Sequence, residues 1–72
     1  MGYRNLKAEM ARKDITIKDL MTVTGKSRPG ISNNLNGRGR FTVEESLAIR
    51  RAYFPEMSID YLFESDEDRE EN

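Results

Sequence analysis

The chain has 72 residues, which is enough for one domain and too few for two. It contains no cysteine and no histidine, so disulfides, thiolate metal sites and histidine-based catalysis are excluded. A core of this size is small, and stability must come from helix packing and well-capped helix ends.

The net charge of −1 conceals an uneven distribution. Residues 1–55 carry 11 Lys and Arg against 5 Asp and Glu, a charge of +6, whereas residues 56–72 carry −7. A basic body suits a phosphate-rich ligand. The acidic end is expected to be a solvated tail, with a site for a basic partner or a device that weakens non-specific nucleic-acid binding as alternatives.

Several classes of protein are excluded on similar grounds. No apolar run approaches the ~20 residues that span a bilayer, and the first residues lack the apolar core of a signal peptide. We therefore expect a cytoplasmic protein without a membrane partner. No phosphate-cradling loop is present, and the adjacent Glu44 and Glu45 cannot face each other on a helix. We expect no enzyme, no cofactor and no metal.

The pattern predicts an all-α fold of five short helices. Tyr3, Leu6 and Met10 recur at helical spacing over residues 3–13, and the first helix ends at Asp14. Thr16 is placed to cap a second helix, and the spacing to an acidic residue at position 19 resembles a capping box.

Glycine and serine separate the second helix from the third. Leu20 and Val23 give the second helix its apolar side, and Gly25 is expected to end it in a left-handed conformation. Ser27 then caps a third helix, which begins with a proline in its first turn and ends near residues 36–37, an Asn-Gly turn signal.

A basic loop over residues 37–41 leads to the fourth helix, which Thr42 and Glu45 cap and which runs to about Tyr53. Its predicted core stripe consists of Val43, Leu47, Ala48 and Ala52. Ser58 caps a fifth helix over residues 59–63, whose core residues are expected to be Ile59, Leu62 and Phe63. The predicted domain covers residues 1–64, and residues 65–72 are a predicted disordered acidic tail.

The informative stretch is residues 16–37, two short capped helices joined by a glycine turn. Such a motif can place its second helix in the major groove of DNA. Asn33 can pair with an adenine edge, and Arg28 can reach guanine or phosphate. The glycines beside Arg38 and Arg40 would let the loop approach a phosphate. The alternative is that all four are ordinary solvated side chains.

The sequence resembles the phage Cro/repressor family of helix-turn-helix proteins over residues 3–63. Residues 35–63 in particular resemble small lytic-switch regulators of temperate phages of Gram-positive bacteria, some of which are similar to modulators of repression. The matching residues are Thr16, Leu20, Gly25, Ser27, Ile31, Asn36, Gly37, Thr42, Leu47 and the segment 58–63. The resemblance implies a lambda-repressor-like fold whose recognition helix spans residues 27–36.

Position by position, the resemblance implies base-reading positions at Arg28, Pro29 and Asn33, with Ser32 as a lesser candidate. With the short polar side chain at position 36 and the two loop arginines, these residues make up the predicted DNA-binding set. That set is Arg28, Pro29, Ser32, Asn33, Asn36, Arg38 and Arg40. The chain departs from the family pattern at Ile17, where the family commonly has a glutamine that contacts phosphate, and at Met21, which the family usually fills with alanine. Pro29 and Gly30 also replace longer polar residues.

Two functions follow as expectations. The first is a transcriptional regulator that binds double-stranded operator DNA in a phage genetic switch in the host bacterial cytoplasm, acting as a weak homodimer on two half-sites. The second is an anti-repressor that binds a phage repressor protein. Its acidic surface would be Glu56, Asp60 and Glu64, facing a basic partner.

Overall fold

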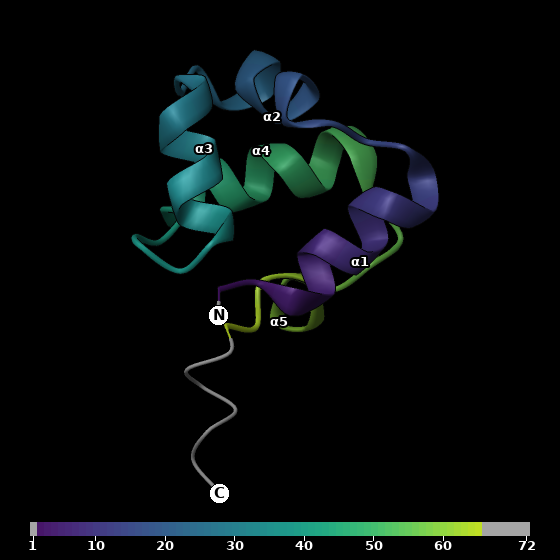
Figure 1. Ribbon diagram of the computed structural model, residues 1–72. Coiled ribbons are helices and arrows are strands. Elements are labelled where there is room, and N and C mark those ends of the chain that lie inside the picture. The colour runs from purple at the N-terminus through teal and green to yellow at the C-terminus, as the bar shows by residue number, and fades with distance from the viewer. Residues whose placement is uncertain (1, 66–72) are drawn as a thin grey trace, which may run out of the picture.

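The computed structural model describes residues 2–65, and this part of the chain contains five helices (Figure 1). They are α1 (Arg4–Lys13), α2 (Ile17–Thr24), α3 (Arg28–Leu35), α4 (Val43–Tyr53) and α5 (Ile59–Leu62). No strand occurs within those residues, so the prediction of an all-α, five-helix fold is confirmed.

Hydroxyl side chains start four of the five helices. Thr16 and Thr42 each form a full capping box, in which the hydroxyl accepts the N–H of the third helical residue, at 3.3 and 3.1 Å. Ser27 and Ser58 accept single N–H groups at the starts of α3 and α5. Each cap satisfies donors that lack a partner within the helix, which typically contributes about 1 kcal/mol. The predicted caps are confirmed.

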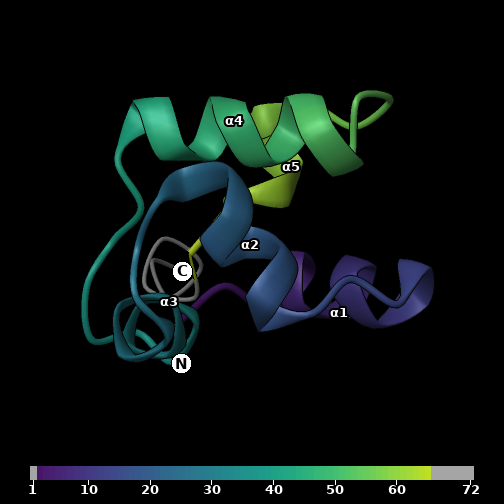
Figure 2. The same ribbon diagram turned by 90° about the horizontal axis from the view of Figure 1, so that it is seen from above.

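The core forms where the helices converge. Each helix contributes one fully buried apolar side chain, and the C-cap of α4 adds a second from that helix; the set is Leu6, Leu20, Ile31, Ile49, Phe54 and Leu62. Three helices each pack on two others: α2 packs on α3 and α4, α4 packs on α2 and α5, and α5 packs on α1 and α4. Figure 2, which views α3 end-on, shows that α3 stands across the direction of α4.

Three aromatic rings join the start of the chain to its later segments. Tyr3, Phe41 and Phe63 pack with ring centroids 5.3 to 6.0 Å apart. The Phe41 N–H also donates to the Tyr3 hydroxyl at 3.2 Å. These contacts hold the first residues, the loop before α4 and the end of α5 together.

The predicted core stripe of α4 is wrong. Val43 is 75% exposed, Ala52 is exposed, and Leu47 and Ala48 are only partly buried. The buried face instead carries Ser46 and Ile49, with Tyr53 packed at its end. Apolar residues occur on both sides of this helix, so their spacing alone could not decide which side faces inward.

The C-terminal segment differs from the prediction in detail. Leu62 is fully buried and Phe63 packs against the core, whereas Ile59 is only partly buried. Ser65, which was assigned to the tail, is 4% exposed and lies in the body. Residues 66–72, the rest of the predicted tail, lie outside the described residues.

Gly25→Val should lower the free energy of unfolding by about 1–3 kcal/mol. Gly25 has φ 79°, a left-handed conformation that β-branched residues avoid, and a Cβ there would meet no atom within 4 Å. The loss would therefore come from backbone strain and not from a clash. Thermal unfolding of Gly25→Asn is the control, since asparagine tolerates this conformation and should lose less. Equal losses in both variants would contradict the assignment.

Ile49→Ala and Leu47→Ala should separate the two faces of α4. Removing the fully buried Ile49 side chain should cost about 2–5 kcal/mol. Leu47→Ala should cost under about 1 kcal/mol, because among residues 2–65 Leu47 is not one of the side chains packed against the core. Urea unfolding measures both changes. A larger loss for Leu47→Ala would restore the original prediction for α4.

Candidate nucleic-acid interface

One side of α3 is open to solvent. Arg28, Pro29 and Asn33 are exposed on the helix, Ser32 is partly exposed beside them, and Asn36 continues this side as the exposed C-cap. The opposite side holds the buried Ile31, Asn34 and Leu35. The five predicted contact residues of this helix therefore share one face, which we call the α3 outer face.

The turn before α3 is tied to the rest of the body. The Ser27 hydroxyl accepts the Gly30 N–H at 3.2 Å, which fixes the first turn of α3. The Lys26 ammonium lies 3.3 Å from a Glu45 carboxylate oxygen on α4 and 5.7 Å from the centre of the Phe41 ring. Both Lys26 and Glu45 are partly buried, so this pair orients the start of α3 against α4.

The loop after α3 lies close to the end of that helix. The Arg38 N–H donates to the Asn33 carbonyl at 2.8 Å, and the Gly37 N–H donates to the Asn34 carbonyl at 3.1 Å. A Cβ at Gly39 would lie 2.9 Å from the Asn34 amide oxygen, so the glycine lets the loop approach this side chain closely. The loop is therefore positioned by α3 itself.

A hollow of about 250 Å³ opens beside this loop. Two arginines contribute to its wall, and the lining residues are Gly2, Tyr3, Gly37, Arg38, Gly39, Arg40 and Ser65. The Arg40 guanidinium donates to the Ser65 hydroxyl at 3.3 Å, whereas Arg38 is exposed. The hollow is large enough for an anionic group such as a phosphate, and smaller than a typical pocket for a drug-sized ligand.

The charge around these features has one sign. Residues 20–43, which include α3 and the loop, carry four basic residues and no acidic residue. The four are Lys26, Arg28, Arg38 and Arg40. Lys26 is paired with Glu45 of α4, so the three arginines carry the net positive charge of this segment, which suits an anion.

Two positions where the sequence departs from the pattern of the family that it resembles, Ile17 and Met21, lie on α2. Ile17, at the first position of α2, is partly buried and packs against the core, as does Met21 one turn later. Ile17 therefore supplies no hydrogen bond at the position where a family member would contact phosphate. The start of α2 can still offer its backbone N–H groups.

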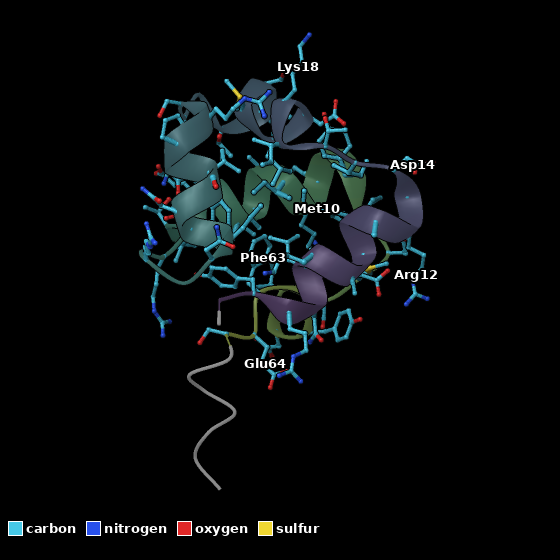
Figure 3. All side chains as sticks on the ribbon, viewed as in Figure 1. Met10, Arg12, Asp14, Lys18, Phe63 and Glu64 are labelled. Carbon is cyan, nitrogen blue, oxygen red and sulfur yellow. The ribbon has the colours of Figure 1, made fainter. Side chains whose placement is uncertain are left out.

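The proposed acidic partner surface is not one cluster. Glu56 lies 2.5 Å from the Lys13 ammonium, and this hydrogen bond lowers the pKa of the Glu56 carboxyl. Glu64 accepts a hydrogen bond from Asn5 at 3.3 Å. Lys13 and Asn5 are eight residues apart on α1, about 12 Å along the helix, so Glu56 and Glu64 lie toward its two ends. Figure 3 shows Glu64 far from the α1 end that carries Asp14.

Asp60, the third predicted acidic residue, is exposed in the first turn of α5. The next residue, Tyr61, donates a hydrogen bond of 2.7 Å to the buried Glu9 on α1, and this bond raises the pKa of the Tyr61 hydroxyl. Arg12 lies 3.4 Å from the other Glu9 oxygen. Sequence reasoning missed this network because nothing in the local pattern marks Glu9 as buried.

Asn34 was also missed. It is 5% exposed, and its amide nitrogen has no hydrogen-bond partner among residues 2–65. Its place on the core side of α3, between Ile31 and Leu35, is visible in the helical spacing. Its position beneath the loop could not be predicted, because that position depends on the close approach of Gly39 to its amide oxygen.

Comparison with known proteins finds no matching family model, no matching curated protein and no matching solved structure. Within residues 2–65, no group of three or more acidic side chains is arranged to hold a metal ion. In the same range, every helix is too short or too polar to cross a membrane.

Proposed function

We propose that the protein is a transcriptional regulator that binds double-stranded operator DNA through α3. The observation that carries the proposal is the α3 outer face, which presents hydrogen-bonding side chains within a segment free of acidic residues. The resemblance to small phage regulators adds the setting, a lytic or lysogenic switch in the cytoplasm of a bacterial host.

In this mechanism α3 enters the major groove, which admits one helix. Asn33 reads an adenine edge, and Arg28 contacts guanine or phosphate at the start of the helix. Ser32 and Asn36 add short contacts, and Pro29 packs against the groove wall. Arg38 contacts the phosphate backbone from the loop, and Arg40 adds positive charge at the hollow beside it.

A single short recognition helix gives limited affinity, so we propose that two copies act on half-sites about one helical turn apart. No ligand pocket or metal is needed for this activity, in keeping with a regulator that is not an enzyme and takes no cofactor.

A second candidate is an anti-repressor that binds a phage repressor. Ile17 favours it, because this side chain packs on the core where the family places a phosphate contact. Pro29 favours it too, since it is exposed at a base-reading position and offers no side-chain hydrogen bond. The α3 outer face would then meet the repressor's dimer surface, since a segment without acidic residues does not match the charge of a basic DNA-binding surface. Co-purification with the repressor of the same phage, without any DNA shift by this protein alone, would favour this candidate.

Asn33→Ala should remove sequence discrimination, whereas Arg38→Ala should weaken binding to every sequence. The lost base contact should cost about 1–3 kcal/mol per half-site on the preferred DNA only. The lost phosphate contact should weaken preferred and random DNA alike and reduce the salt slope by about 0.9. Titrations against DNA selected from a random pool, at several salt concentrations, measure both effects.

Both variants should fold as the wild type does, because each side chain is exposed. Arg38 is preferred to Arg40 for this test, since Arg40 also contacts Ser65 in the body. An unchanged ratio of selected to random affinity for Asn33→Ala would show that α3 does not read the base at that position.

Deleting residues 66–72 should raise DNA affinity at low salt by about tenfold, the low end for electrostatic effects on association. The deletion removes five acids and one arginine, which moves the net charge from −1 to +3. The melting temperature should be unchanged, because the segment offers no apolar side chain. Filter binding at low and high salt tests this, and a gain that persists at high salt would contradict a screening role.

A further inference from the structure

The side of α4 that faces away from the core is unusually apolar for an exposed helix face. Val43 is 75% exposed, the highest value among the large hydrophobic side chains of residues 2–65. Leu47 and Ala48 are partly exposed and Ala52 is exposed on the same side. Two charged residues, Glu44 and Arg51, are exposed among them. We call these six residues the α4 outer face.

The two charges on this face have no partner within the described part of the chain. Glu44 and Arg51 take part in no hydrogen bond or ion pair among residues 2–65, whereas the neighbouring Arg50 donates to the Met57 and Pro55 carbonyls. Seven residues separate Glu44 from Arg51, which is about 10.5 Å along the helix. They point to the same side and are too far apart to pair within one helix.

The order of residues on this face is self-complementary. When two copies of α4 lie antiparallel about a two-fold axis between Leu47 and Ala48, Leu47 of one copy meets Ala48 of the other. Glu44 then meets Arg51, and Val43 meets Ala52, each pair occurring twice. Large side chains thus face small ones, and each charge faces the opposite charge.

We propose that the α4 outer face is a surface on which a second copy of this chain docks, with the two α4 helices antiparallel. The partner is a second copy of the chain because the α4 outer face is complementary to itself in side-chain size and in charge. One face of an 11-residue helix buries less than the roughly 1,200 Å² of a standard interface. The dimer is therefore weak, with a dissociation constant in the micromolar to millimolar range.

This pairing has a consequence for α3. In each copy α3 precedes α4 in the chain, and Figure 2 shows the loop that leads from α3 to the N-terminal end of α4. The antiparallel arrangement puts the two N-terminal ends at opposite ends of the dimer, so the two α3 helices are separated by the paired α4 helices. The proposal does not rest on DNA binding, and its test contains no DNA.

Sedimentation equilibrium of the full chain, at concentrations up to about 1 mM and low salt, tests the pairing. The wild type should show a reversible monomer–dimer equilibrium. Glu44→Arg alone and Arg51→Glu alone each place like charges opposite each other twice, and each should weaken the dimer by about tenfold or more. An equimolar mixture of these two variants restores both opposite-charge pairs and should associate, as should the double variant.

Charge reversals elsewhere serve as controls. Asp60→Arg matches Glu44→Arg, since both acids are the second residue of their helices, and Lys18→Glu matches Arg51→Glu as an exposed reversal. Neither should change the dissociation constant. Leu47→Ala tests the face without altering charge, and should weaken the dimer while circular dichroism shows the same helix content. A wild type that stays monomeric at the highest concentration, or a mixture that associates no better than its components, would overturn the proposal.

Discussion

Gly25 ends α2 with a left-handed backbone, and three residues later α3 begins in a new direction. The turn between them is short, so the direction of α3 depends on that one conformation and on the Lys26–Glu45 pair that ties the turn to α4. The buried side of α3 then fits the core through Ile31 and Leu35. The direction of α3 and the burial of this side together decide which side chains the α3 outer face exposes to solvent.

The same placement explains the loop after α3. The Gly37 and Arg38 N–H groups donate to the last carbonyls of α3, so the loop arginines are carried with the helix. The side chains proposed to read bases and the loop arginines proposed to contact phosphate therefore lie on adjoining segments. In a domain with so small a core, the helix caps and the Tyr3–Phe41–Phe63 cluster add contacts that hold the first residues, the loop before α4 and the end of α5 together.

Local features were predictable from the sequence. The four hydroxyl caps and the conformation of Gly25 depend on residues within one turn of one another, and the pattern marks them directly. The α3 outer face was also predictable in its register, because Ile31 and Leu35 fix which side is buried and leave Asn33 outside.

Features that depend on distant residues were not predictable. Lys26 pairs with a residue 19 positions away, and Lys13 with one 43 positions away. The inward side of α4 was missed because Ser46 is buried there while Val43 is exposed, against their polarity. The acidic residues Glu56 and Glu64 were grouped by their nearness in sequence, and the fold places them toward opposite ends of α1.

The central claim is that α3 and its loop form the surface that meets DNA. The most direct test is to follow the backbone amide resonances of ¹⁵N-labelled protein while duplex DNA is added at low salt. The account predicts that the largest changes fall on residues 28–40, with small changes on α1 and α5. Changes confined to α1 and α5, or none at saturating DNA, would contradict it.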